Sequence, residues 1–386
     1  MSTEIMVRRC LEMKSKSGMV DDKTSEDALN RFDKYSIPIL IPVFGYPSGT
    51  HVPYTCTNNS SSLPSIPKMK LLLRRCQTNE CPSVDYFSKL CTENDDKDGL
   101  RFSLKENYCF RKHSKYPSSI VGSCKGILCL EDFYKTGNIV LWNPVTDELK
   151  SLPPSSIECP PDSDSTSFFT GGFVFDARSE DFKVLRHVLN GFAYDDGSYK
   201  STLIQAELYS LKNDSWRRIV KPEEYQWPRS SLPISLNGSC YWKAFDCVVS
   251  FNFAEEVFSS LPLPGTNKCN RLLFDMDGKL GSFVITRDLE AVKQKRFDIL
   301  LWESNKWRWS KVYSFVVKDG IRPLGFWGRD KCFLQGRNRQ LLVFDLTTQK
   351  MMPLDMEEFS GAQSLVSFEE STVSISKIEN NLQSSL

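Results

Sequence analysis

Apolar residues along this chain recur in a fixed frame that predicts β-hairpins. If Trp142 is position zero, Leu149 and Leu152 are positions seven and ten, with the turn formers Asn-Pro-Val-Thr-Asp between them. The same spacing recurs five times, and a polar residue follows each aromatic anchor. The six sets are Trp142, Leu149, Leu152; Phe175, Phe182, Leu185; Tyr209, Trp216, Ile219; Phe251, Phe258, Leu261; Trp302, Trp309, Val312; and Phe344, Met351, Leu354. Each set predicts a strand, a turn and a second strand.

The spacing of the anchors indicates a repeat architecture. The gaps between successive anchors are 33, 34, 42, 51 and 42 residues. A β-propeller blade is a four-stranded antiparallel sheet of about 40 to 50 residues that must stack on its neighbours. We therefore predict an all-β fold, a β-propeller of roughly six blades over about residues 68 to 372. The short early gaps predict that two hairpins share a blade there.

A second type of strand precedes several anchors and begins with glycine. It occurs in GSCKGILCL at Gly122, GSCYWKAF at Gly238 and DGKLGSFVI at Asp277. Glycine allows backbones to pass closely, so we expect these segments to be the crowded inner strands of the blades.

The two ends of the chain differ from the repeat region. Residues 1–67 hold prolines within their longest apolar run and then a segment rich in turn formers, so we expect an irregular N-terminal segment and a linker. Residues 373–386 are mostly polar, and we expect a frayed tail.

The charge balance and the absence of long apolar segments argue against two classes of partner, nucleic acid and membranes. Basic and acidic residues number 49 and 48, which argues against nucleic acid, and no segment has the apolar length of a membrane span or signal peptide. We expect no membrane partner and a location in the cytoplasm or the nucleus.

Thirteen cysteines, scattered through strand-like runs, are expected to be reduced core residues. Cys76 and Cys81 lack a second ligand pair at short spacing, so we expect neither metal nor cofactor.

The sequence offers no catalytic constellation. His51, His113 and His187 lie on separate segments, so we expect a non-catalytic binding protein. The repeat frame places Trp216 and Trp309 in the core, whereas Trp307 falls outside the frame.

Two insertions are candidates for recognition. The first, Leu189 to Thr202, interrupts the repeat with aromatic and acidic side chains of the kind that anchor protein interfaces. An ordinary tolerated loop is the alternative. The second, Arg287 to Arg296, is basic in its C-terminal half, and its alternative is a solvated connection. The candidate target contacts in the first insertion are Phe192, Tyr194, Asp195, Asp196 and Tyr199.

An ordered series of segments resembles the F-box-associated domain of plant F-box proteins over about residues 68–370, and it is most similar to the S-locus F-box-like group. The segments are IVGSCKGILCL, NIVLWNPVTDELKSLPP, GGFVFDARSEDFKVLRHV, AELYSLKNDSWRRI, GSCYWKAF, VVSFNFAEEVFSSLPLP and LLVFDLTTQKMMPLD. The resemblance implies a kelch-like propeller that recognises targets for a cullin-RING (SCF-type) ubiquitin ligase, with protein degradation as the outcome. In the S-locus group the targets are pistil S-ribonucleases, and the process is self-incompatibility.

The family's F-box, which binds a Skp-type adaptor, opens with a Leu-Pro-acid motif and closes with Cys-Lys-x-Trp. Neither motif occurs in residues 1–67, where Leu63-Pro64 is followed by Ser-Ile-Pro. A Skp-type adaptor is therefore an expected partner only if an F-box is present. Three hypotheses stay open: a ligase receptor for an S-ribonuclease-like or other target protein, an F-box-less interaction propeller or pseudogene product, and a propeller enzyme or lectin-like binder.

Overall fold

The chain divides into two compact units, Met1–Ser65 and Ile66–Leu386. The computed structural model describes residues 70–76, 85–95, 99–110, 118–132, 137–193, 199–222, 233–265, 270–287, 294–337, 340–354 and 362–376. All of these belong to the second unit. The predicted irregular segment 1–67 and the absence of an F-box within it lie outside the described residues and stay predictions.

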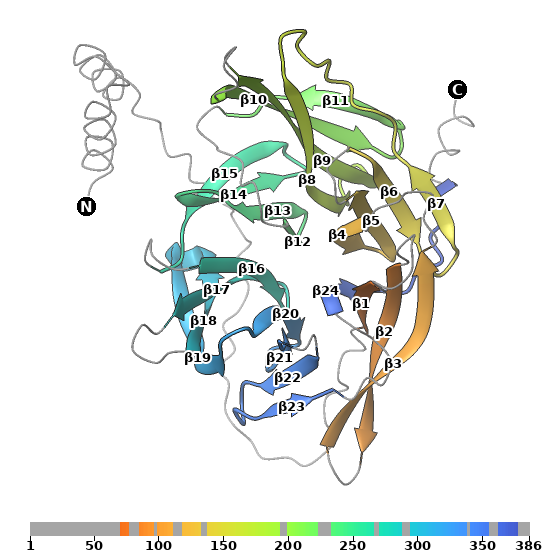
Figure 1. Ribbon diagram of the computed structural model, residues 1–386. Helices are drawn as coiled ribbons and strands as arrows, with labels where there is room; N and C mark the ends of the chain where they lie inside the picture. The colour runs from red at the N-terminus through yellow and green to blue at the C-terminus, as the bar shows by residue number, and fades with distance from the viewer. Residues whose placement is uncertain are drawn as a thin grey trace, which may run out of the picture. The chain divides into compact units, whose positions relative to one another are not determined.

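The second unit is a ring of six four-stranded antiparallel sheets (Figure 1). The first blade holds β24 (Ala362–Phe368), β1 (Lys70–Cys76), β2 (Asp85–Asp95) and β3 (Gly99–Phe110). The second holds β4 (Ser118–Cys124), β5 (Ile127–Asp132), β6 (Ile139–Asn143) and β7 (Glu148–Ser151). The third holds β8 (Ser165–Asp176), β9 (Asp181–Ala193), β10 (Tyr199–Ser210) and β11 (Ser215–Ile219).

The remaining blades follow in chain order. The fourth holds β12 (Ile234–Leu236), β13 (Ser239–Lys243), β14 (Cys247–Asn252) and β15 (Val257–Pro262). The fifth holds β16 (Asn270–Met276), β17 (Lys279–Arg287), β18 (Gln294–Glu303) and β19 (Arg308–Lys318), with the short 3₁₀ helix η1 (Ser304–Lys306) between the last two. The sixth holds β20 (Arg322–Trp327), β21 (Lys331–Gln335), β22 (Leu341–Asp345) and β23 (Met351–Pro353). The predicted propeller of roughly six blades is confirmed.

Both ends of the propeller build its first blade. The C-terminal strand β24 pairs antiparallel with β1, with Lys70 opposite Phe368 and Leu72 opposite Val366. The first strands of the blades, β4, β8, β12, β16, β20 and β24, contact one another in turn around the ring. Because the last of these strands belongs to the same sheet as β1, the ring closes through backbone hydrogen bonds.

The structure confirms the six hairpins predicted from the spacing of apolar residues. In all six sets the anchor lies directly opposite the residue seven positions later, as in Trp142 with Leu149 and Phe251 with Phe258. Five of the six hairpins join the third and fourth strands of a blade. The exception, at Phe175, joins β8 and β9, so the hairpins at Phe175 and Tyr209 share the third blade as the gaps predicted.

The polar residue after each anchor shapes the hairpin turn. Asn143 Oδ1 accepts the backbone N–H of Val145 at 3.0 Å, and the side chains of Asp176, Asn252 and Asp345 make equivalent bonds. The residue five positions after each anchor has a left-handed backbone, with φ between 46° and 59°. These residues are Asp147, Glu180, Asp214, Glu256, Trp307 and Gln349. Short polar side chains thus stabilise a turn that returns the chain in register.

The glycine-containing segments hold both turn glycines and a close-approach glycine. Gly281 of the third segment is the close-approach position, because a Cβ there would clash with the Phe274 ring. Gly238 and Gly278 have φ of +74° and +77°, and a Cβ built on either one would meet nothing within 4 Å. Each follows a residue that also has positive φ, which gives the type I′ turn favoured in two-residue hairpins. Gly122 does lie in the inner strand β4, but a Cβ there would make ordinary contacts, the nearest at 3.5 Å.

The core lies between blades. Each of the six buried apolar clusters joins two neighbouring blades, and together they cover all six interfaces. Two tryptophans at the seventh position of the frame add hydrogen bonds across these interfaces. Trp216 Nε1 donates to the carbonyl of Pro153 at 2.9 Å, and Trp309 Nε1 donates to that of Pro262 at 2.7 Å. The Leu-Pro pairs at the ends of the hairpins therefore supply acceptors to the next blade.

The start of the C-terminal tail packs against the second blade. Asn143 Nδ2 donates to the carbonyls of Ser371 at 3.0 Å and Val373 at 2.8 Å, and Ile375 is 2% exposed. The Glu148 carboxylate accepts the hydroxyl of Ser374 at 2.8 Å. The frayed tail expected from residue 373 is therefore not observed for residues 373–376, and residues 377–386 lie outside the described residues.

Candidate functional site

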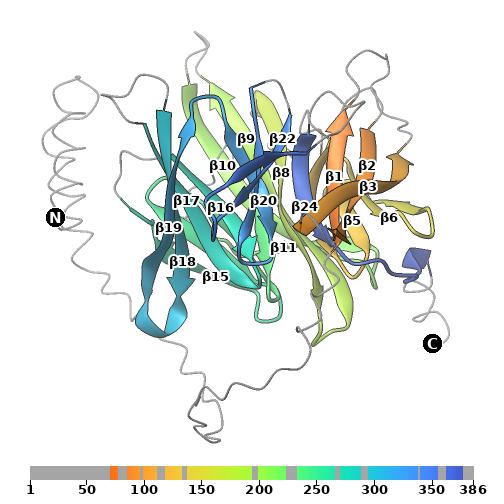
Figure 2. The ribbon, with the colours of Figure 1, turned by 90° about the horizontal axis from the view of Figure 1, so that it is seen from below.

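Antiparallel strands divide the connections of the propeller between two rims (Figure 2). Turns that join first to second strands and third to fourth strands lie at one end of the blades, which we call the tight-turn rim. Its described turns have five residues or fewer. Connections from second to third strands, and from blade to blade, lie at the other end, which we call the loop rim. They include longer segments such as 152–164 and 220–233.

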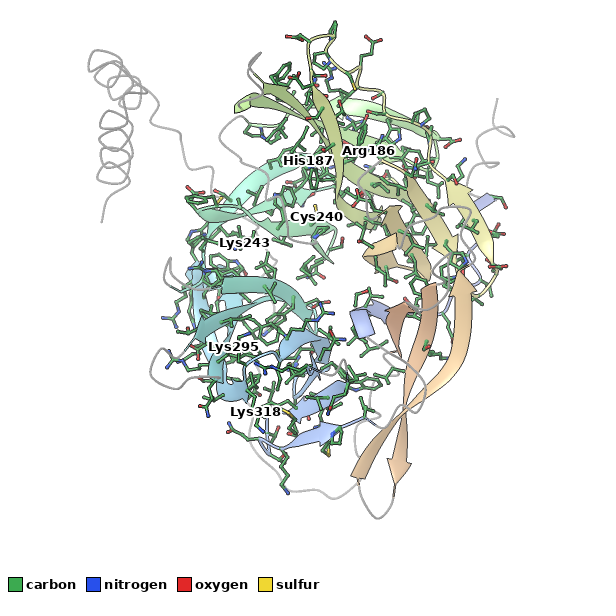
Figure 3. The ribbon with its side chains drawn as sticks, in the orientation of Figure 1. Arg186, His187, Cys240, Lys243, Lys295 and Lys318 are labelled. Atoms are coloured by element: carbon green, nitrogen blue, oxygen red, sulfur yellow. The ribbon has the colours of Figure 1, made fainter. Side chains whose placement is uncertain are left out.

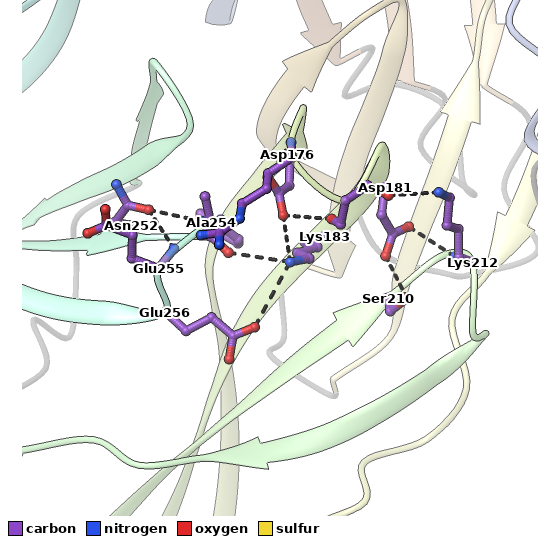
Figure 4. A network of polar contacts seen from close by, with 12 residues as sticks. Asp176, Asp181, Lys183, Ser210, Lys212, Asn252, Ala254, Glu255 and Glu256 are labelled. Carbon is purple, nitrogen blue, oxygen red and sulfur yellow. Dashed lines mark hydrogen bonds and ion pairs between the residues drawn. The ribbon is translucent and has the colours of Figure 1, made fainter.

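Ion pairs and hydrogen bonds within the protein occupy the tight-turn rim (Figure 4). Lys183 Nζ in β9 lies 2.7 Å from Asp176 of its own blade and 4.0 Å from Glu256 of the fourth blade. Burial raises the pKa of the Asp176 carboxyl, but hydrogen bonds from Lys183 and Ser179 outweigh that effect, and the net pKa is lowered. Lys183 thus links the turns of the third and fourth blades at this rim.

Two of the five predicted target contacts are described by the structure, and both lie at the loop rim. Phe192 lies near the end of β9 and is half-buried, and Tyr199 begins β10, so the insertion extends the β9–β10 hairpin of the third blade. Phe192 pairs with Ser201 across the hairpin. Tyr194, Asp195 and Asp196 lie outside the described residues. The contact role of all five residues stays a prediction.

The structure adds exposed apolar residues that sequence reasoning missed. Phe245, in the turn between β13 and β14, is 86% exposed, and Val220, just after β11, is 90% exposed. Both lie at the loop rim, on the third and fourth blades. Exposed aromatic side chains on ordered turns are favourable anchors for protein partners. Trp307 is 60% exposed but lies at the tight-turn rim, whereas Trp216 is buried as predicted and Trp309 is half-buried.

Arg186 and Glu207 form a buried ion pair in the third blade, and Figure 3 labels Arg186. Arg186 in β9 is 1% exposed, and its Nε donates to Glu207 Oε1 in β10 at 2.7 Å. Arg186 Nη1 also donates to the carbonyl of Gly137 at 2.8 Å, and its guanidinium lies 3.8 Å from the Trp216 ring centroid. Burial lowers the pKa of Arg186, and the Glu207 charge offsets part of that shift.

The Glu207 carboxylate also fixes a connection at the loop rim. Its oxygens accept the hydroxyl of Ser155 at 2.9 Å and both the backbone N–H and the hydroxyl of Ser156 at 3.0 Å. The segment 152–164, which joins the second blade to the third, is therefore attached to the buried ion pair. Because Arg186 and Glu207 are both fully buried, we assign them a structural role.

Other reactive side chains are also buried in the core. His187 is 0% exposed against the rings of Trp242 and Phe258, and burial, with a smaller effect of Lys221, lowers its pKa well below 6.5. Cys129, Cys240 and Cys332 are free thiols whose pKa burial raises strongly, as expected for reduced core cysteines. Among the described residues, no group of three or more His, Cys, Asp or Glu side chains could hold a metal ion.

The sequence of residues 81–378 matches the model of the F-box associated beta propeller domain family. The chain belongs to this family. The match covers most of the propeller, from just before β2 to just beyond the tail segment packed on the second blade. Within the described part of the family domain, no helix has the length and apolar character needed to cross a membrane.

Proteins with similar sequences carry F-box names. The chain is 24% identical over 277 residues to F-box protein CPR1 of Arabidopsis thaliana, covering 64% of this chain and 66% of that protein. It is 28% identical over 304 residues to F-box protein At3g07870 of the same plant, covering 69% and 68%. A solved oligogalacturonate lyase in complex with manganese has a TM-score of 0.42 at 11% identity, covering 73% and 77%, which is too weak to support an argument. The match thus spans about two thirds of the length of each of these two plant proteins, and a smaller share of other relatives, such as 60% of putative F-box protein At3g10430.

Proposed function

We propose that this chain is the target-recognition subunit of an SCF-type cullin-RING ubiquitin ligase and that it holds a target protein at the loop rim. The observation that carries the proposal is the family match over residues 81–378, whose relatives are F-box proteins. In this role the propeller is a receptor, and catalysis belongs to other subunits of the ligase.

The difference between the rims supports the choice of the loop rim. The tight-turn rim uses its charges in contacts within the protein, such as those of Lys183 and Asp176. The loop rim carries the longer connections and the exposed Phe245 and Val220. Binding residues are concentrated in loops that a rigid scaffold positions. We include Phe192, Tyr194, Asp195, Asp196 and Tyr199 among the proposed target contacts.

The finer assignment follows from the S-locus-like series of segments described above. It proposes an S-ribonuclease-like target, a location in the cytoplasm or the nucleus, and a Skp-type adaptor that binds through an F-box. One observation favours a second candidate, an F-box-less interaction propeller that competes with intact relatives for the target: residues 1–67 lack the Leu-Pro-acid motif.

Co-purification with an adaptor tests the ligase role. The full chain is co-expressed with a tagged Skp-type adaptor and a cullin, and transfer of ubiquitin to a purified S-ribonuclease is measured. The ligase proposal expects adaptor binding and ubiquitin transfer, which require that an F-box be present despite the missing motifs. A chain that binds the target without the adaptor supports the competing-propeller candidate, and a chain that binds neither refutes both.

A pair of variants tests the assignment of the rim. Tyr194→Ala combined with Tyr199→Ala should weaken target binding. Trp307→Ala, which removes an exposed aromatic side chain from the tight-turn rim, is the matched control and should leave binding unchanged. Equal loss in both variants, or loss in the control alone, would show that the loop rim is not the target surface.

A further inference from the structure

The turn between β18 and β19 holds a large aromatic residue at a position where the other hairpins hold polar ones (Figure 2). Trp307 is the fifth residue after the anchor Trp302. In the five other hairpins of the frame, this position holds Asp147, Glu180, Asp214, Glu256 or Gln349. The repeat itself therefore does not require an aromatic side chain in this turn.

The backbone of Trp307 is in the left-handed region, with φ of 49° and ψ of 46°. Bulky side chains rarely adopt this conformation, because the Cβ atom approaches the following carbonyl oxygen. Asparagine and aspartate tolerate it better. Tryptophan thus adds backbone strain that a short polar residue at position 307 would reduce. Strained residues of this kind are concentrated at functional sites.

Burial of the indole does not account for a tryptophan in this turn, because Trp307 is 60% exposed. Its ring contacts that of Trp302 edge to face, with 5.2 Å between the centroids. The Trp302 ring in turn lies 5.4 Å from the Trp309 ring. We call these three residues the tryptophan cluster. Its rings run from the interface with the fourth blade, where Trp302 and Trp309 are half-buried, to the exposed ring of Trp307.

The half-buried side of the tryptophan cluster already contacts a leucine-proline segment of the chain. Trp309 Nε1 donates to the carbonyl of Pro262 at 2.7 Å. Leu261 and Leu263 pack in the same apolar cluster as Trp302 and Trp309. Aromatic grooves recognise extended proline-containing segments in this way, because such segments have no internal hydrogen bonds and keep their carbonyls available.

The third blade shows that this contact does not need an exposed tryptophan. Trp216 Nε1 donates to the carbonyl of Pro153 at 2.9 Å, which is the same bond in an equivalent hairpin. Two positions before Trp216 is Asp214, whose carboxylate accepts the hydroxyl of Tyr209 at 2.7 Å. Trp307 is thus an addition to the leucine-proline contact rather than a part of it.

We propose that Trp307 anchors a docking site at the tight-turn rim for an extended leucine-proline segment of a partner protein other than the target. The exposed indole presents to this partner the kind of aromatic surface that Trp309 presents to the chain's own leucine-proline segment. The docking site is separate from the proposed target surface, because the two rims lie at opposite ends of the blades. It therefore does not depend on whether the chain delivers a target to a ligase.

Peptide binding to the full chain tests the docking site. The probe is a fluorescent peptide with the sequence of residues 259–265, Ser-Ser-Leu-Pro-Leu-Pro-Gly, and its anisotropy is measured. A second peptide has alanine in place of both prolines. The test variant is Trp307→Asn, which removes the ring and suits the left-handed backbone. The matched control is Phe245→Asn, which removes an exposed aromatic side chain from the loop rim.

We expect Trp307→Asn to weaken binding of the proline peptide at least about ten-fold and Phe245→Asn to change it by less than about two-fold. Trp307→Tyr keeps an aromatic ring and should retain binding within about three-fold. The alanine peptide should bind about ten-fold more weakly, because it lacks the preformed extended conformation. The Tm of Trp307→Asn should stay within about 2 °C of that of the parent chain, because relief of strain offsets the lost ring contact.

Four results would overturn the docking site: no saturable binding of the proline peptide, equal binding of the two peptides, unchanged binding in Trp307→Asn, or equal loss in Trp307→Asn and Phe245→Asn. A fall in Tm of more than about 5 °C in Trp307→Asn would also overturn it, because Trp307 would then have a structural role. These results are distinct from failure of the proposed function, which is measured by adaptor binding and ubiquitin transfer.

Discussion

Replacing Glu207 by glutamine should destabilise the propeller more strongly than its small change in shape suggests. Glutamine keeps an acceptor for Ser156 but removes the carboxylate that is hydrogen-bonded to the Arg186 guanidinium, which is 1% exposed. The charge of Glu131 also acts on Arg186 and remains in the variant. Removing one partner of a buried ion pair typically costs about 3–5 kcal/mol. With an entropy of unfolding of about 2.1 cal/mol/K per residue over roughly 300 residues, this loss lowers Tm by about 5–8 °C.

The assay is thermal unfolding followed by tryptophan fluorescence and circular dichroism. Glu255→Gln, at an exposed position of a turn, is the control and should leave Tm unchanged. The double variant Arg186→Met/Glu207→Gln removes the uncompensated charge, so it should recover about half of the loss. The reasoning is refuted if Glu207→Gln changes Tm no more than the control does, or if the double variant is less stable than the single variant.

Three further changes test other parts of the structure. Trp309→Phe removes the hydrogen bond to Pro262, and we expect it to lower the free energy of unfolding in urea by about 1 kcal/mol. Trp307→Phe changes an exposed site and should lower it by less than about 0.5 kcal/mol. Equal effects would contradict a stabilising role for the Trp309 hydrogen bond. Asn143→Ala should release the C-terminal segment, detected as faster carboxypeptidase cleavage than in the parent chain, and unchanged cleavage would contradict its anchoring role. Burial lowers the pKa of His187 well below 6.5 in the folded protein. As the pH falls below 6.5, His187 therefore takes up a proton in the unfolded state but not in the folded state. The free energy of unfolding should then fall by about 1.4 kcal/mol per pH unit. His187→Leu should remove this part of the acid sensitivity, and an unchanged pH profile of Tm would contradict it.

Local geometry explains why the hairpins were predictable from the sequence. A hairpin with a four-residue turn places residues seven apart opposite one another, so the register of Tyr209 with Trp216 is encoded within eight positions. The polar residue after the anchor is part of the same local code, since its side chain closes the turn, as at Asn143. Ring closure has no such local signal, because β1 and β24 are separated by nearly the whole propeller.

The candidate site was only partly predictable for a similar reason. The insertion in the third blade breaks the repeat spacing and is visible in the sequence. Phe245 is not visible, because KAFDC continues an apolar strand pattern, and its exposure depends on a turn between β13 and β14. The pairing of Arg186 with Glu207 joins two strands whose sequences each place a charge among apolar residues, so neither segment alone indicates a buried partner.

The two rims of the propeller separate the residues that set blade register from the proposed target surface. The side-chain bonds that set hairpin register, such as those of Asp176 and Asn252, lie at the tight-turn rim, where substitution would disturb the blades. The connections at the loop rim carry few of these bonds in the described residues, apart from the anchor of segment 152–164 on Glu207. Changes in the β9–β10 insertion would therefore alter the proposed binding surface while blade register stays fixed. Under the proposed receptor role, target recognition can vary at this rim with little loss of stability.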